Sequence, residues 1–211
     1  MRATTSILNS ALKHGNSLKR LVLTSSVTAV REDPTVPRTF SESNWNDAAV
    51  EAVKTKGPAA GPYVIYSASK VLAEKAAWEF VAAHESEISW DLVTINPPWI
   101  FGVSLFILPN FFLTVDVSPH VMQPSLGPAP TVDDINVSQR EIYDTLSGVQ
   151  TRISALLGGQ GTWVHVAVAA EAHVRATHAP AAGGHRIIVR SGPFFYQDIR
   201  KFYIPFVSYI R

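Results

Sequence analysis

Tyr66 and Lys70 have the residue types and the spacing of a proton-donating pair. The stretch YSASK, residues 66–70, separates a phenol from an ammonium by three small residues. On a helix, side chains at i and i+4 are neighbours, and a cation beside a phenol stabilises the phenolate and lowers its pKa from about 10. Such a phenol can give a proton to the alkoxide that forms when hydride reduces a carbonyl.

A serine at the end of a predicted strand can complete this chemistry. The segment KRLVLTSSVTAV, residues 19–30, carries Ser25 and Ser26 after its apolar run. Either hydroxyl can hydrogen-bond a carbonyl oxygen and hold it for Tyr66. A tyrosine four residues before a lysine also occurs by chance in ordinary helices. The order of three signals favours a functional site: TSS, then Tyr66 about forty residues later, then NPPWIFG at 96–102.

The elements around these residues predict half of a doubly wound α/β sheet. Residues 3–14 have one apolar helical face, and 19–30 contains a continuous apolar run that is typical of a buried parallel strand. A Pro- and Ser-rich loop at 31–47 precedes a helical pattern over 63–83 and a second strand within 89–102. Because ligands bind at the carboxyl ends of such strands, we expect the two strand ends and the helix to converge.

The helix over 63–83 is expected to have a packed stripe and a solvent-facing side. Its small residues at 67–69 are expected to let the helix approach a cofactor closely. The expected packing residues are Ala68, Val71, Leu72, Ala76 and Phe80, and the expected solvent-facing residues are Glu74, Lys75 and Glu79.

The second half of the chain has a less regular pattern, which predicts a smaller mixed α/β domain packed on the first. Its predicted elements are a helix at 132–148, a strand at 162–166, a helix at 169–179, and a strand, a turn and a final helix within 183–204.

Composition excludes several classes of function. Charged residues make up 17% of the chain and the net charge is +1, so neither nucleic acid nor a membrane is an expected partner, and a small molecule is. The absence of cysteine excludes disulfides and thiol chemistry and makes the cytoplasm the default location. The longest apolar run, 104–115, is shorter than the roughly 20 residues of a membrane span. The histidines lack zinc-ligand spacing, so no metal is expected.

These stretches together resemble the extended short-chain dehydrogenase/reductase family of the NAD-dependent epimerase/dehydratase superfamily. The branch most similar to the chain includes dihydroflavonol reductases, cinnamoyl-CoA reductases and fungal methylglyoxal or aldehyde reductases. The resemblance implies a partial Rossmann-like sheet and an NADP(H)-dependent reductase of a ketone or aldehyde, with NAD as the other cofactor considered. The stretches that carry it are KRLVLTSSVTAV, YSASKVLAEKAAWEF, NPPWIFG, DDINVSQREIYDTLSG, WVHV with AEAHVRA, and SGPFFYQDI.

The resemblance also implies domain limits and roles for individual residues. Residues 1–102 correspond to the C-terminal half of a dinucleotide-binding domain, and 103–211 correspond to part of a substrate domain. The implied roles are a catalytic triad of Ser26, Tyr66 and Lys70, with Tyr66 as proton donor; cofactor contacts from Tyr66, Lys70, Pro97, Ile100 and Ser138; and a substrate pocket shaped by Val27 and Trp99.

The sequence departs from the family at its beginning. The family opens with a strand and a glycine-rich turn that binds the pyrophosphate, and this sequence contains no such turn. We therefore expect the first βαβ units, roughly a hundred residues, to be missing from the chain. A sheet without them has an unpaired edge, which favours association with a second copy, so a homo-oligomer is one expected assembly.

Two other functions stay open at this point. One is a nucleotide-sugar epimerase or dehydratase of the same superfamily. The residues of the stretches TSSVTAV and KAAWEF favour the reductase over this alternative. The other is a non-catalytic remnant that keeps Ser26, Tyr66 and Lys70 but cannot hold a dinucleotide, and that acts as a binding module.

Overall fold

The computed structural model describes residues 2–32, 38–101 and 160–195. The helix predicted at 132–148, its candidate Ser138 and the final helix beyond residue 195 lie outside the described residues. The chain divides into two units. The first lies within Met1–Pro97 and Ala170–Val189, and the second within Pro98–Ala169 and Arg190–Arg211.

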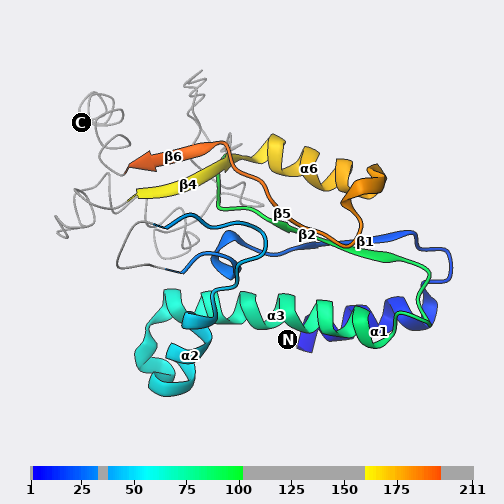
Figure 1. Cartoon of the computed structure of the whole chain (residues 1–211), viewed down its shortest axis with the longest axis horizontal. Coiled ribbons are helices and arrows are strands. Elements are labelled where there is room, and N and C mark those ends of the chain that lie inside the picture. Colours follow the sequence, from blue (N-terminus) through cyan, green and yellow to red (C-terminus); the bar gives the residue numbers. More distant parts are fainter. Residues whose placement is uncertain (1, 33–37, 102–159, 196–211) are drawn as a thin grey trace, which may run out of the picture. The chain divides into compact units, whose positions relative to one another are not determined.

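The first unit is built on a parallel sheet whose strands have the order β1-β2-β5, as the predicted α/β fold requires (Figure 1). In register, β1 pairs Leu21 with Leu92 of β2, and β2 pairs Thr94 with Arg186 of β5. The elements of this unit are α1 (Arg2–His14), β1 (Arg20–Thr24), η1 (Val27–Ala29), α2 (Asp47–Lys56), η2 (Gly57–Ala60), α3 (Pro62–Ala83), β2 (Asp91–Asn96), most of α6 (Val166–His178), η4 (Pro180–Ala182) and β5 (Arg186–Ile188).

Helices cover both faces of this sheet, as in a doubly wound fold. Helices α1 and α3 lie on one face and α6 lies on the other (Figure 1). On the α3 face, Leu92 packs with Leu8 of α1 and Ala77 of α3. On the α6 face, Val93 packs with Ala176 of α6. Successive residues of a strand point to opposite faces, so a single strand supplies both cores.

The central strand is more buried than its neighbours. Residues Leu92–Asn96 of β2 are all buried, whereas the residues of β1 are only partly buried and Thr24 is exposed. The sequence correctly predicts the parallel strand at 20–24 but overstates its burial, because β1 lies at one edge of the described sheet and only one of its sides is paired.

Helix α2 has no counterpart among the predicted elements, although both of its ends carry the usual signals. The side chain of Asn46 accepts a hydrogen bond from the backbone N–H of Ala49 at 3.1 Å and caps the first turn. Gly57 ends the helix with a φ of 54°, a left-handed conformation that glycine adopts without strain. Helix α2 packs against α3.

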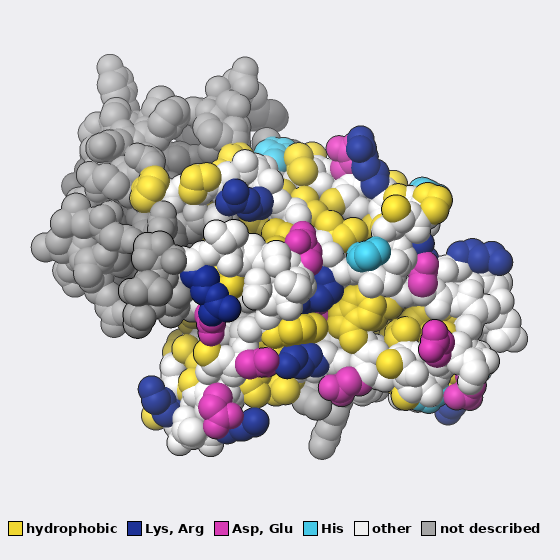
Figure 2. All heavy atoms as spheres, in the orientation of Figure 1, with side chains coloured by type: hydrophobic (Ala, Val, Ile, Leu, Met, Phe, Trp, Pro, Cys, Tyr) yellow, Lys and Arg dark blue, Asp and Glu magenta, His cyan; other side chains and the backbone are white. Residues whose placement is uncertain are grey.

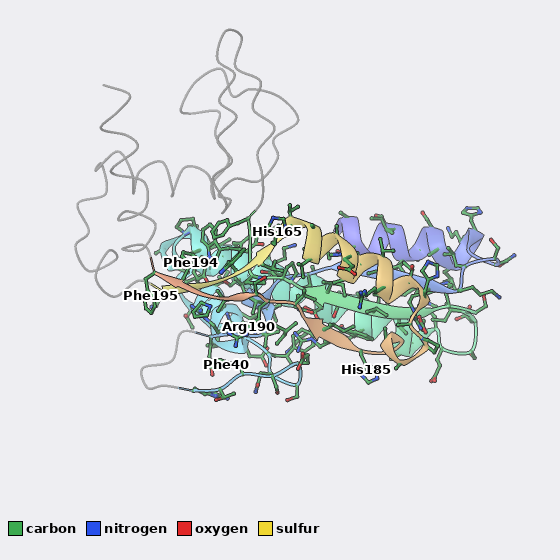
Figure 3. All side chains as sticks on the ribbon, turned by 90° about the horizontal axis from the view of Figure 1, so that it is seen from above. Phe40, His165, His185, Arg190, Phe194 and Phe195 are labelled. Atoms are coloured by element: carbon green, nitrogen blue, oxygen red, sulfur yellow. The ribbon has the colours of Figure 1, made fainter. Side chains whose placement is uncertain are left out.

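The second unit contains a separate three-stranded mixed sheet. Strand β4 (Gln160–His165) pairs parallel with β3 (Trp99–Phe101) and antiparallel with β6 (Gly192–Phe195). The sequence predicts a strand, a turn and a final helix within 183–204, and the structure forms strand β6 at the place of the turn and the first residues of that helix; Phe194 and Phe195 of β6 are labelled in Figure 3. The ring of Phe194 lies 5.3 Å from that of Phe101, centroid to centroid, within an aromatic cluster.

Charges of both signs are mixed on the visible face of the described residues (Figure 2). Figure 2 shows Lys and Arg side chains interspersed with Asp and Glu over the described part of the visible face. Within the described segments, no helix combines the length and the apolar character that a bilayer span needs.

An ion pair joins the amino ends of β1 and β2. The guanidinium of Arg20 donates from Nε and Nη2 to the two carboxylate oxygens of Asp91 at 2.5 and 2.7 Å. Its Nη1 donates to the carbonyls of Ala176 and Ala179 at the end of α6. The hydrogen bond and the charge of Asp91 raise the pKa of Arg20. A β-carbon at Gly183 would lie only 2.1 Å from Asp91 Oδ2, so this pair requires glycine there.

We predict that Gly183→Ala destabilises the first unit by roughly 1–3 kcal/mol, the usual cost of overpacking, because the added methyl group displaces the Asp91 carboxylate. Chemical denaturation of both proteins measures this difference. In an Asp91→Ala background, the same substitution should cost clearly less. An equal cost in both backgrounds would show that the methyl group acts through some other contact.

Candidate active site

The carboxyl ends of β1 and β2 converge, as the sequence predicts. The backbone N–H of Ser25 donates to the carbonyl of Ile95 at 2.8 Å, and that of Val27 donates to the carbonyl of Pro97 at 3.0 Å. These two bonds continue the parallel pairing beyond the last residue of β1, so the chain at Ser26 is held beside the end of β2.

Ser26 begins the short helix η1 and is 7% exposed. Its Oγ accepts hydrogen bonds from the backbone N–H of Thr28 at 3.2 Å and from Thr28 Oγ1 at 3.1 Å. Among the described residues, the hydroxyl hydrogen of Ser26 has no acceptor. Hydrogen bonds in a chain polarise one another, so a hydroxyl that accepts two bonds is a better donor for a third. Ser26 can therefore donate to an added ligand.

Ser25 uses its hydroxyl differently. Its Oγ donates to Glu74 Oε2 at 2.5 Å, and both residues are buried. The hydroxyl hydrogen of Ser25 is thus committed to a carboxylate inside the protein. The sequence alone leaves either serine as the carbonyl-binding residue, and these contacts favour Ser26.

Glu74 lies in the interior, and its predicted place on the solvent-facing side of the helix is wrong. The side chain is 1% exposed. It accepts four hydrogen bonds, one from the residue after β1, two from β2 and one from the first residue of β5: Ser25 Oγ at 2.5 Å, Thr94 Oγ1 at 3.0 Å, Asn96 Nδ2 at 2.9 Å and Arg186 Nε at 2.6 Å. The observed buried positions of α3 are Ser67, Ala68, Val71, Glu74 and Ala77.

The environment of Glu74 keeps its carboxyl group ionised. Burial alone raises the pKa of a carboxyl group, but the hydrogen bonds from Arg186, Ser25 and Asn96, together with the charge of Arg186, outweigh it and lower the pKa of Glu74 below its ordinary value. A buried carboxylate with this many donors is a fixed negative charge at the end of the sheet.

Arg186 of β5 extends this network to the segment before α2. Its Nη1 donates to the carbonyls of Glu42 and Asn44, each at 2.6 Å. Its guanidinium carbon lies 3.6 Å from the ring centroid of Trp45, a stacked cation–π contact. Arg186 thus joins β5, the Glu74 carboxylate and the 42–45 segment.

Tyr66 and Lys70 occupy successive turns of α3 and come together as the helical spacing predicts. Lys70 Nζ lies 5.9 Å from the centroid of the Tyr66 ring, and Tyr66 is 46% exposed. Among the described residues, no carboxylate pairs with Lys70. Helix α3 also packs against η1, the helix that Ser26 begins. Of the small residues between the pair, Ser67 and Ala68 are buried and Ser69 is exposed.

The structure places the other candidate residues in several parts of the chain. Pro97 is buried and Val27 is half-buried, and the two are joined by the Val27 N–H bond to the Pro97 carbonyl. Trp99 and Ile100 belong to β3 of the second unit, and Ser138 lies outside the described residues. Within the part of the chain that the structure describes, no group of three or more His, Asp or Glu residues could hold a metal ion.

Comparisons with known proteins find relatives among oxidoreductases. An uncharacterised oxidoreductase of Saccharomyces cerevisiae is 32% identical over 206 residues, 94% of this chain and 51% of that protein. The NADPH-dependent methylglyoxal reductase of the same yeast is 31% identical over 199 residues, 92% of this chain and 49% of the reductase. The crystal structure of yeast methylglyoxal/isovaleraldehyde reductase complexed with NADPH matches with a TM-score of 0.67 at 28% identity, covering 92% of this chain and 50% of that one.

The chain therefore spans about half the length of the curated relatives it matches. No family model matches the chain.

We predict that the Glu74 carboxylate stabilises the fold at pH values above its ordinary pKa and no longer does so in acid. Because its pKa is lowered by folding, the stabilisation is complete above about pH 4.3 and is lost as pH falls through the lower folded value. Glu74→Gln should reduce the free energy of unfolding at pH 7 by about 3–5 kcal/mol, since it leaves Arg186 buried without its partner.

The difference between wild type and Glu74→Gln, measured by denaturation at several pH values, should shrink as the solution is acidified below about pH 4. Glu79→Gln removes an exposed carboxylate from the same helix and is the matched control, with little effect expected at any pH. A Glu74→Gln difference that does not change with pH would contradict the assigned ionisation.

Proposed function

Since this chain belongs to the extended short-chain dehydrogenase/reductase family, we propose that it reduces a ketone or aldehyde with NADPH and that Tyr66 is the proton donor. The observation that carries the proposal is that Tyr66 and Lys70 are neighbours on α3, and that α3 packs against η1, the helix that begins at Ser26, whose hydroxyl hydrogen has no acceptor among the described residues. All three groups belong to the first unit.

Each side chain has a separate task in this proposal. The Ser26 hydroxyl donates to the carbonyl oxygen of the substrate and holds it in place. Tyr66 gives its phenolic proton to that oxygen as negative charge develops on it, and the Lys70 ammonium stabilises the phenolate that remains. Val27, beside Ser26, is the proposed contact within the first unit for the rest of the substrate, and the role that the family resemblance implies for Trp99 of β3 stays a prediction.

The residues present fit one end of a dinucleotide. A phenol and an ammonium on successive turns of α3 are suitable donors for ribose hydroxyls, so Tyr66 and Lys70 would hold the nicotinamide ribose. Pro97 is proposed to line the nicotinamide ring. The roles that the family resemblance implies for Ile100 at that ring and for Ser138 at a phosphate stay predictions. When bound, the dinucleotide supplies the hydride for the carbonyl carbon. We propose NADPH rather than NADH as the cofactor, because a similar yeast reductase is NADPH-dependent.

A second candidate function rests on the sequence. The glycine-rich turn that binds the pyrophosphate in this fold is not in these 211 residues. A chain that cannot hold the dinucleotide would act as a binding module without catalysis. In the reductase proposal the chain acts in the cytoplasm on a small carbonyl compound and associates with a second copy.

We predict that NADPH raises the melting temperature of the chain and quenches its tryptophan fluorescence, with a smaller effect from NADH. Because a ligand that binds only the folded state stabilises it by mass action, the shift should grow with NADPH concentration. No response at millimolar NADPH would exclude the reductase proposal for this chain and favour the non-catalytic binding module.

We predict that Tyr66→Phe lowers kcat for methylglyoxal reduction by about 10²–10⁴-fold while leaving NADPH binding nearly unchanged, because only the proton donor is removed. Loss of NADPH absorbance measures the rate. Tyr63→Phe removes the hydroxyl of a similarly exposed tyrosine on the same helix and should leave kcat within about twofold. Equal rates for wild type and Tyr66→Phe would overturn the role given to the phenol.

A further inference from the structure

Glu74 is the buried ionisable group closest in sequence to the proposed catalytic pair, and the chemistry above does not use it. It follows Lys70 by one turn of α3 and Tyr66 by two turns. The side chain points into the protein rather than to solvent, and both of its oxygens are occupied by donors. Its function is therefore to hold other groups in place and not to react.

Two of the four donors to Glu74 lead directly to Ser26. Ser25, the preceding residue, donates its hydroxyl to Glu74 Oε2. The side-chain amide of Asn96 donates to the same oxygen at 2.9 Å and also to the backbone carbonyl of Ser26 at 3.2 Å. One carboxylate oxygen on α3 thus binds the side chain of the residue before Ser26 and, through Asn96, is linked to the backbone carbonyl of Ser26.

The remaining donors fix the carboxylate itself. Arg186 Nε on β5 and Thr94 Oγ1 on β2 both donate to Oε1. The buried guanidinium of Arg186 is held in turn by the carbonyls of Glu42 and Asn44 and by the ring of Trp45. The carboxylate therefore has little freedom to turn, and the geometry that it imposes on Ser25 and Asn96 is well defined.

We propose that Glu74 is a positioning residue that sets the Ser26 hydroxyl relative to Tyr66 and Lys70, by tying the helix of the pair to the strand end of the serine. This inference rests on the proposed reductase function. Because Glu74 is covalently part of the same helix as Tyr66 and Lys70, a shift of α3 along the sheet would carry the phenol and the serine contacts together. The distance between the Ser26 hydroxyl and the Tyr66 phenol would then stay constant.

The chain offers a matched control for this role. Arg20 and Asp91 form a second arginine–carboxylate pair between β1 and β2, at the amino ends of the same strands. Asp91→Asn and Glu74→Gln each remove one carboxylate charge that faces a largely buried guanidinium. They differ in the end of the sheet that they disturb, and only the Glu74 end carries Ser26.

The test compares wild type, Glu74→Gln and Asp91→Asn as full chains, at a temperature where all three are folded. We expect Glu74→Gln to lower kcat for carbonyl reduction by about 10–100-fold with little change in KM for NADPH, because displacements near 1 Å at a reacting group have effects of this size. Asp91→Asn should keep kcat within about twofold despite its own loss of stability. Equal kcat for Glu74→Gln and wild type would overturn the positioning role.

Amide hydrogen exchange gives a readout that does not need activity. In Glu74→Gln, exchange should become at least about tenfold faster at the amides of Ser25 and Val27, which bond to the end of β2, and should change little at the amino end of β2. Asp91→Asn should show the reverse pattern. Uniformly faster exchange across the sheet in Glu74→Gln would mean that the residue only stabilises the fold.

The two proposals can fail separately in this experiment. If wild type neither binds NADPH nor reduces a carbonyl, the proposed function fails, and the exchange pattern alone decides whether Glu74 orders the Ser26 segment. If Glu74→Gln does not fold, Ser25→Ala replaces it, since it removes one of the two links to Ser26 and leaves the ion pair with Arg186 intact. Unchanged kcat and unchanged exchange at Val27 in Ser25→Ala would then overturn the inference.

Discussion

A carboxylate inside a protein must be surrounded by donors or it loses its charge, and this requirement shapes the carboxyl end of the sheet in the first unit. Glu74 on α3 is met by Ser25 from the end of β1, Thr94 and Asn96 from β2, and Arg186 from β5. The polar side chains on the α3 face thus come from β2, from β5 and from the residue after β1, and they lie within two residues of one another along the strand register. The apolar cores lie further toward the amino ends of the strands and on the opposite face.

This polar layer explains why two adjacent serines are not equivalent. Strand alternation turns Ser25 toward α3, where its hydroxyl donates to Glu74. The next residue leaves the strand, begins η1 and keeps its hydroxyl hydrogen without an acceptor among the described residues. The first serine belongs to the framework and the second belongs to the candidate site. The family resemblance implies that Ser26 is the functional serine, and the hydrogen bonds of the two serines give a physical reason for that choice.

The match to NADPH-dependent reductases covers about half of their length, and the structure shows what that half contains. It holds a serine at a strand end, the Tyr66 and Lys70 pair, and the polar layer that connects the helix to the sheet. The part of the fold that binds the pyrophosphate is not in the sequence. The residues proposed for proton transfer and the glycine-rich turn of this fold therefore belong to separate stretches of sequence, which is why cofactor binding is the first property to measure.

The sequence by itself determined the elements and the local pair. Periodicity predicted α1, β1, α3, β2 and α6 because apolar spacing is a local property, and Tyr66 and Lys70 are neighbours because one helix fixes their separation. Helix α2 also carries local signals at its ends, the Asn46 cap and Gly57. Tertiary structure alone decided that β5, almost a hundred residues after β2, pairs with it and brings Arg186 to Glu74.

A charged residue in a helix is normally assigned to solvent, because burial of an unpaired charge is too costly, and so Glu74 was placed on the wrong face. Its position in the stripe with Val71 and Ala77 was the one local signal of burial. The partners that make its burial favourable come from three strands far apart in the chain. No local pattern contains them, since they meet only when the sheet has formed.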